Sequence, residues 1–133
     1  MNPLKSFAIS SILVTLLLSA SAAIANESTS KDSLHTKMEP IVVNLRGSDQ
    51  QYIRVELILQ LAKQEIDERV KLYMPVIRHK LIFLLTRMGT NQLDSVEGKQ
   101  KLAQESKGII NQAIGLTDKE GIVDVLFSSF IIQ

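Results

Sequence analysis

The sequence predicts an α+β fold, in which two or three helices pack on a small antiparallel sheet behind a hydrophobic amino-terminal segment. Residues 52–61 alternate apolar and polar side chains, which is typical of a strand with one buried face. From residue 66 to 88 apolar side chains recur every three or four positions, as in an amphipathic helix. A second helical pattern and a final apolar run complete the order strand, strand, helix, helix, strand.

The first 25 residues are a hydrophobic segment separate from this domain. Lys5 is the only charged side chain before Glu27, and the run between them is long enough to cross a membrane at about 1.5 Å per residue. Ala23 and Ala25 also place small residues where a signal peptidase acts. The segment is therefore a signal peptide, the favoured alternative, or an uncleaved anchor, and both export the rest of the chain.

The remainder divides into a linker and one domain. Residues 26–37 are rich in Ser, Thr, Lys and Asp and predict a flexible linker. Residues 38–133 form the domain, which begins with a short strand at 41–45 that follows Pro40. The turn residues 46–49 join this strand to the long one, which predicts an antiparallel hairpin.

The helical half of the domain contains residues that typically bend, end or cap a helix. Pro75 lies within the first helical pattern, where we expect a bend at residues 73–74. Gly89 is placed to end this helix. Ser95 is expected to cap the second helix, with Glu97 in its first turn.

The chain closes with a predicted strand at residues 122–132 that is apolar on both faces. Such a strand belongs in the middle of a sheet or against a partner. The alternation places two sets of side chains on opposite faces: Val123, Val125 and Phe127 on one, and Leu126, Phe130 and Ile132 on the other.

Composition excludes several classes of function. The 133 residues contain 15 Lys and Arg against 14 Asp and Glu, scattered among one another. Nucleic-acid binding needs a concentrated basic surface, so none is predicted. The chain has no Cys, and hence no disulfide framework and no thiolate metal site.

The residue types that could carry catalysis do not converge. His35 lies in the predicted linker, and His79 has no second His at metal-pair spacing. The adjacent Asp67 and Glu68 face different directions on a helix. Ser128–Ser129 lacks the glycine-flanked turn of a nucleophile. We predict a non-enzymatic protein with no catalytic, cofactor-binding or metal-binding residues and no small-molecule substrate.

Five segments in this order resemble the FliL family of flagellar basal-body proteins: residues 38–45, 52–57, 74–78, 93–99 with Leu102, and 123–133. The resemblance covers about residues 38–133, and it implies a periplasmic domain with a stomatin-like fold at the inner membrane. It implies association with the flagellar stator complex (MotA/MotB-type), assembly into a homo-oligomeric ring, and support of rotation, torque, swarming and chemotaxis. Family members usually carry a longer cytoplasmic tail before their transmembrane helix, so this chain departs from the pattern there.

We derive two alternative functions from these observations. The first is an interaction protein that contacts stators through apolar surfaces, because residues 82–85 and 127–132 are more apolar than so small a domain requires. The alternative is a periplasmic or membrane scaffold unrelated to motility.

Overall fold

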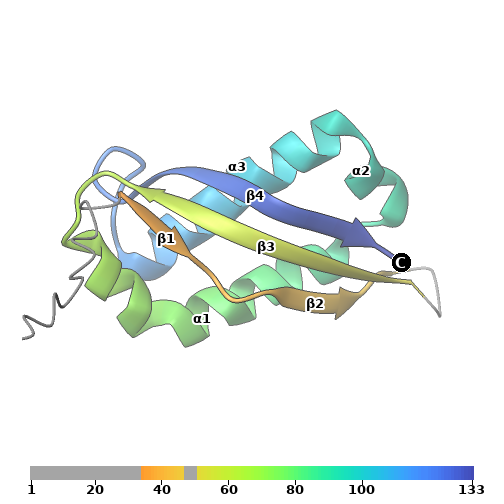
Figure 1. Ribbon diagram of the computed structural model, residues 1–133, viewed down its shortest axis with the longest axis horizontal. Helices are drawn as coiled ribbons and strands as arrows, with labels where there is room; N and C mark the ends of the chain where they lie inside the picture. The colour runs from red at the N-terminus through yellow and green to blue at the C-terminus, as the bar shows by residue number, and fades with distance from the viewer. Residues whose placement is uncertain (1–33, 47–50) are drawn as a thin grey trace, which may run out of the picture.

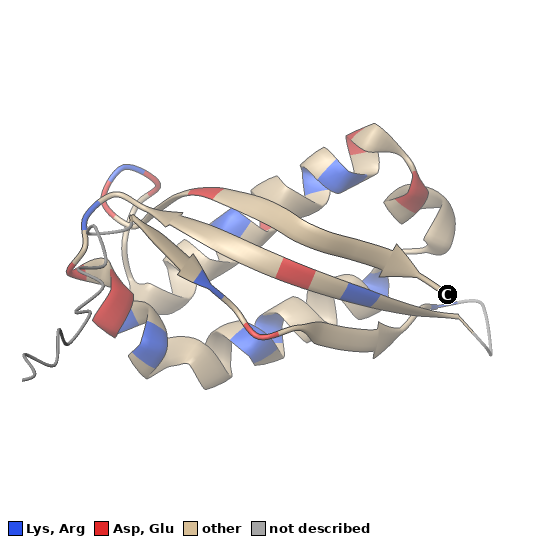
Figure 2. Ribbon diagram, in the orientation of Figure 1, with Lys and Arg blue, Asp and Glu red and all other residues tan. Residues whose placement is uncertain are grey.

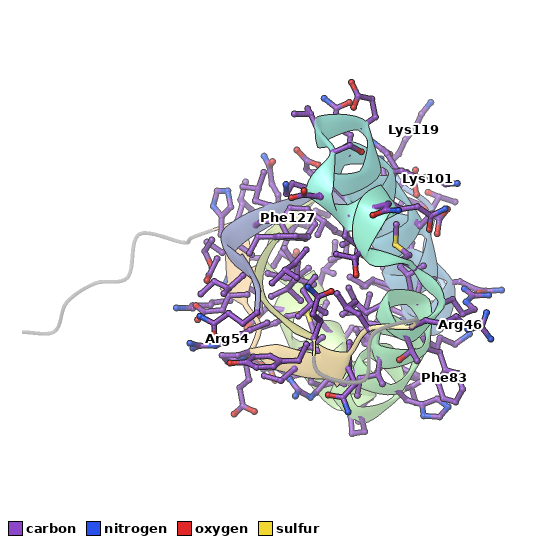
Figure 3. The ribbon with its side chains drawn as sticks, turned by 90° about the vertical axis from the view of Figure 1, so that its right-hand side faces the viewer. Arg46, Arg54, Phe83, Lys101, Lys119 and Phe127 are labelled. Atoms are coloured by element: carbon purple, nitrogen blue, oxygen red, sulfur yellow. The ribbon has the colours of Figure 1, made fainter. Side chains whose placement is uncertain are left out.

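The computed structural model describes residues 34–46 and 51–133, and these form two layers. An antiparallel sheet makes one layer and the helices make the other (Figures 1 and 3). The elements in chain order are β1 His35–Lys37, β2 Ile41–Asn44, β3 Tyr52–Leu61, α1 Ile66–Arg87, α2 Thr90–Asp94, α3 Val96–Ile114 and β4 Ile122–Ile132. The α+β class with a small antiparallel sheet is therefore confirmed. The amino-terminal segment, most of the predicted linker and residues 47–50 lie outside the described part.

The long strand β3 is the centre of the sheet. β2 pairs with its first half, with Ile41 opposite Val55, and this confirms the predicted antiparallel hairpin. β1 pairs with its second half, so β1 and β2 follow one another along one edge of β3. β4 pairs with β3 along the other edge for its whole length (Figure 1). The last three residues of the predicted linker therefore belong to the sheet as β1.

The structure differs from the predicted final strand in two ways. β4 pairs only with β3 among the described strands, so of the two predicted positions, the middle of the sheet is wrong and contact with a partner stays a prediction. The register also shifts beside Ser128, because Ser129 faces Glu56 whereas Phe127 faces Leu57. This bulge returns Phe130 and Ile132 to the same face as Val125 and Phe127, since one extra residue reverses the alternation.

The core lies between the two layers. Ile53, Val55, Leu57, Leu59 and Leu61 of β3 all point into it, as the alternation predicts, and each is at most 3% exposed. The helices contribute a matching set of buried side chains from α1, α2 and α3: Ile66, Val70, Ile77, Leu81, Leu84, Leu85, Leu93, Leu102, Ile110 and Ile114. Burial of this apolar surface is the main force that holds the helices on the sheet.

Helix α1 runs without interruption through Pro75, so the expected bend at residues 73–74 does not break it. The Pro75 side chain lies on the exposed side. Near the middle of the helix, the Arg78 guanidinium donates hydrogen bonds to the carbonyls of Glu39 and Pro40, at 3.0 and 3.2 Å. This contact holds the connection between β1 and β2 against α1.

The junction between α2 and α3 depends on Ser95 and Gly98. The Ser95 hydroxyl accepts a hydrogen bond from the Gly98 amide at 2.9 Å, which confirms Ser95 as the cap. A Cβ on Gly98 would lie 1.5 Å from the carbonyl oxygen of Gln92. Gly98 is therefore required by the close approach of the two helices.

Asn111 fixes the start of β4 to α3. Its buried amide donates to the carbonyl of Ile122 and accepts from the amide of Ile122, at 2.9 and 2.7 Å. It also donates to the Asp118 carboxylate at 2.9 Å, and this bond, with Lys107 adding to it, lowers the pKa of Asp118. Gly115 ends α3 in the left-handed conformation, with φ 67°.

Candidate interaction surface

Helix α1 carries apolar side chains on two opposite faces. One face packs on the sheet. The other presents Leu72, Val76, His79 and Phe83, spaced four, three and four residues apart, which places them in one row along the helix. We call these four residues the outer stripe. Phe83 points away from the sheet in the end view of Figure 3.

The outer stripe is well exposed. Leu72 is 75% exposed, Val76 44% and Phe83 58%, and the imidazole of His79 lies edge-on to the Phe83 ring at 4.7 Å. Five of the eleven exposed large hydrophobic side chains of the described residues belong to α1, where Tyr73 and Ile82 flank the stripe. Clustered exposed apolar side chains of this kind mark interaction sites more often than isolated ones do.

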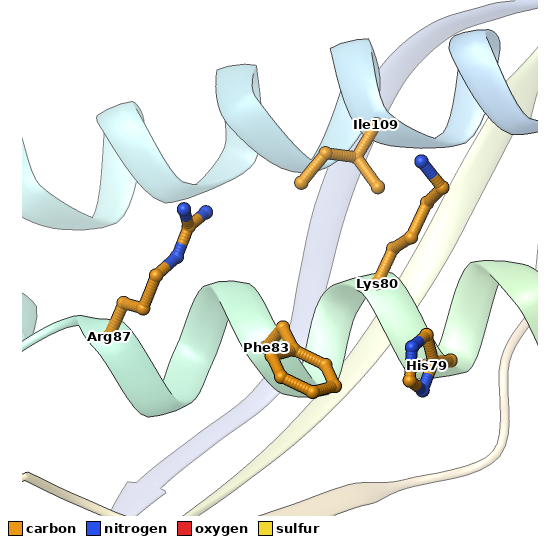
Figure 4. Close-up of a pocket in the computed structure, with 5 residues that line it drawn as sticks. All are labelled: His79, Lys80, Phe83, Arg87 and Ile109. Atoms are coloured by element: carbon orange, nitrogen blue, oxygen red, sulfur yellow. The ribbon is translucent and has the colours of Figure 1, made fainter.

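A shallow groove runs between α1 and α3 beside the stripe. It has a volume of about 340 Å³ and is lined by His79, Lys80, Phe83, Arg87 and Ile109 (Figure 4). Ile109 of α3 forms the apolar wall opposite Phe83, and the cationic ends of Lys80 and Arg87 stand along the same side of α1.

The groove is electropositive. No acidic side chain lines it. Among residues 34–46 and 51–133, neither Lys80 nor Arg87 has an ion-pair partner, whereas Lys71, Lys101 and Lys107 all have one. An apolar row beside two unpaired cations is complementary to a helix or loop that carries apolar and acidic side chains.

The residues considered for catalysis have other roles. His79 packs on Phe83. The Asp67 carboxylate accepts a hydrogen bond from the Thr36 hydroxyl and pairs with Lys71, 2.6 Å away. Glu68 pairs with the same Lys71 at 3.3 Å.

The remaining candidates are also accounted for. The Ser128 hydroxyl donates to the carbonyl of Glu56 at 3.3 Å, within the bulge of β4. His35 lies in β1, at the edge of the sheet. In the part of the chain that the structure describes, no three His, Asp or Glu side chains are grouped so that they could hold a metal ion.

Residues 35–133 match the family model described as "Flagellar basal body-associated protein FliL". The chain belongs to the FliL family. It is 30% identical over 95 residues to the flagellar protein FliL of Aquifex aeolicus, and 27% identical over 97 residues to the FliL of Escherichia coli K12.

The FliL match extends over 71% and 72% of this chain, but over only 57% and 62% of the two relatives. The chain thus spans less than two thirds of the length of these FliL proteins. Both relatives are named as flagellar proteins, and the family is described as associated with the basal body. No helix within the described residues is both long and apolar enough to cross a membrane, and residues 1–33 lie outside that search.

The sequence predicted only one end of this surface. The excess apolar character of residues 82–85 pointed to it, but the structure buries Leu84 and Leu85 and exposes only Ile82 and Phe83. Leu72 was missed because the first half of the helix is dominated by charged residues. A search for a second apolar row, offset from the core row, would have found it.

Proposed function

We propose that this chain is a non-enzymatic basal-body subunit whose α1 outer stripe and neighbouring groove contact the flagellar stator complex (MotA/MotB-type). The contact takes place in the periplasm, at the inner membrane, and supports rotation, torque and swarming. The observation that carries the proposal is the outer stripe itself, an apolar row with unpaired cations on the face of α1 that the core does not use.

The energetics favour a partner at this site. Leu72 and Phe83 together expose most of two large apolar side chains, and burying such a side chain contributes about 1.5–3 kcal/mol. Lys80 and Arg87 add selectivity for an acidic partner and a faster association, because electrostatic complementarity acts mainly on these two quantities. A partner surface with apolar and acidic side chains would satisfy both features.

The test is a double substitution in the flagellated host. Leu72→Ser with Phe83→Ser removes the two most exposed apolar side chains of the stripe without touching the core. Recruitment of fluorescent stators and swarming are expected to fall while the amount of protein stays normal. Gln104→Ser with Gln112→Ser on the exposed side of α3 is the matched control. Normal stator recruitment in the stripe variant would contradict the proposal.

Substitution of the two cations of the groove is a second, independent test. Lys80→Glu with Arg87→Glu reverses the charge of the groove and is expected to reduce recruitment, whereas Lys101→Glu is expected to leave it near normal. A scaffold unrelated to motility is the alternative function. A deletion strain that swims and swarms normally under load would favour that alternative.

The assembly and membrane attachment belong to the same proposal. We infer that copies form a ring and that the outer face of the sheet, where Val42 and Ile131 are exposed, provides apolar contacts between them. Cross-linking of the full chain in membranes tests the ring. Residues 1–25 bring the domain to the inner membrane as an anchor or a cleaved signal peptide, and the mass of the protein from membrane and periplasmic fractions distinguishes the two.

A further inference from the structure

The free edge of β4 is a second surface, distinct from the outer stripe. β4 is the longest strand and pairs only with β3 among the described strands, which leaves its other edge without a neighbouring strand. Its first residues are already covered. Asn111 binds both backbone groups of Ile122, and the Asp124 carboxylate accepts from the amide of Val125 at 2.8 Å. The open stretch therefore runs from Leu126 to the end of the strand.

This edge lacks the usual protections. Natural edge strands are blunted by charged side chains, Pro or a covering segment. β4 holds one charged residue, Asp124, at its covered end, and it contains no Lys or Pro. Figure 2 shows it tan over the rest of its length. The register of β4 against β3 shifts twice, beside Val123 at the covered end and beside Ser128, so only the bulge beside Ser128 interrupts the open stretch.

An apolar hollow lies directly beside the open stretch. It has a volume of about 210 Å³ and is lined by Val96, Lys99, Gln100 and Ala103 of α3 and by Phe127 of β4. Figure 3 shows Phe127 between the strand and the helix layer. A single water molecule occupies about 30 Å³. The hollow is several times larger than this and can therefore hold one aliphatic side chain.

The charge beside the hollow is positive. The Lys99 ammonium lies 5.1 Å from the centre of the Phe130 ring and donates to the Asp94 carbonyl at 3.1 Å, and no acidic side chain lines the hollow. A segment that enters here meets an apolar surface with one cation at its rim. An acidic side chain placed next to an aliphatic one would complement both.

We propose that β4 and α3 form a docking groove for an extended, acidic and apolar peptide segment of another protein, which adds to the sheet as a fifth strand. An added strand lies about 4.8 Å from β4 and passes along the side of α3. Its backbone would bind the free amides and carbonyls of β4, and one aliphatic side chain would enter the hollow, as in recognition by strand addition. An acidic neighbour would approach Lys99.

The probe is a random peptide library displayed on phage, selected against the full chain in nanodiscs. We expect enriched sequences to alternate apolar and polar residues and to include an acidic residue. A selected peptide should slow hydrogen exchange of β4 amides from residue 126 onward. The same peptide with N-methylated backbone amides should lose binding, because strand addition requires backbone donors.

Two matched pairs locate the site on the protein. Ala103→Glu fills the hollow with a charge and is expected to abolish binding, whereas Gln104→Glu makes the same charge change one position away, on the exposed side of α3. Lys99→Gln should weaken binding about fivefold, as for a partly exposed ion pair. Lys101→Gln should leave it unchanged.

Three results would overturn the inference. The first is that no peptide is enriched over the Ala103→Glu chain. The second is binding that survives N-methylation and protects α1 amides in place of those of β4. The third is self-association of the wild-type chain that Ala103→Glu disperses, since the occupant of the groove would then be a second copy.

Discussion

Helices α1 and α3 cover the same face of the sheet, yet their polar and apolar side chains are distributed in opposite ways. α1 has apolar side chains on its buried face and again on its outer stripe. α3 has a polar outer side from Gln100 to Gln112 and buries two polar side chains, Ser106 and Asn111, on its inner side. The fold alone requires one apolar face per helix. The exposed apolar row of α1 and the buried polar side chains of α3 both depart from this pattern, and these two departures have separate causes.

The departure on α3 serves the fold. Asn111 is almost fully buried, and its amide completes the hydrogen bonds of Ile122. Polar groups buried in this way stabilise a structure only when their partners are present. The exposed apolar row of α1 contributes nothing to the core, and the partner contact proposed above would account for it. Variants that separate these two causes test the comparison directly.

The largest effect is expected at the inner face of α1. Ile77 is fully buried, and Ile77→Ala should lower the free energy of unfolding by about 2–5 kcal/mol through lost burial and the cavity left behind. Its neighbour Val76 is 44% exposed, and Val76→Ala should change stability by less than about 0.5 kcal/mol. Urea unfolding of the full chain in non-ionic detergent measures both. Equal losses would show that the outer stripe belongs to the core.

The next effect concerns the buried polar contact of α3. Asn111→Ala leaves the amide and carbonyl of Ile122 without their partner, and it should cost about 2–3 kcal/mol of unfolding free energy. Hydrogen exchange at the Ile122 amide should accelerate at the same time. Gln112→Ala, one residue along on the exposed side, is the control and should be nearly neutral. A neutral Asn111→Ala would remove the structural reason for the inward polar side chain.

Two glycines of α3 separate tertiary packing from helix propensity. Gly98→Ala forces a Cβ against the Gln92 carbonyl and should cost about 1–3 kcal/mol. Gly108 has open space where its Cβ would be, so Gly108→Ala should raise stability by up to about 1 kcal/mol. Thermal unfolding of the full chain compares the two, and a gain in both would contradict the close approach of α2 and α3.

The sequence was sufficient where one local pattern decides the structure. The alternation in β3, the hairpin with β2 and the Ser95 cap were all predicted, because each depends on side chains a few residues apart. The apolar residues at 82–85 likewise gave a partial indication of the α1 surface.

Contacts between distant segments could not be predicted in the same way. The bulge at Ser128 depends on how Phe127 and Phe130 pack under α3, and no local signal marks it. Gly98 has a low intrinsic helix propensity, and only the approach of α2 makes a glycine necessary there. Asn is a residue type that lies mostly at the surface. The burial of Asn111 therefore becomes evident only when the start of β4 is placed beside it.

The smallest effect lies at the amino-terminal end of α1, where charge and not burial links helix and sheet. The Asp67 carboxylate pairs with Lys71 and accepts from the Thr36 hydroxyl of β1, and these hydrogen bonds, that of Lys71 being the larger, lower its pKa from 3.8. A lowered pKa favours the folded state wherever the carboxylate is ionised. This contribution is present above the unfolded pKa and is lost as the pH falls through the folded value.

Asp67→Asn should therefore destabilise the chain by about 1 kcal/mol or less near pH 7, since the pair is partly exposed and screened by solvent. The difference between wild type and variant should shrink as the pH drops below about 4. Glu68→Gln is the control, because Glu68 pairs with the same Lys71 but lacks the contact with β1. Urea midpoints across this pH range measure both variants. A difference that stays constant into acid would mean that Asp67 acts through packing and not through its charge.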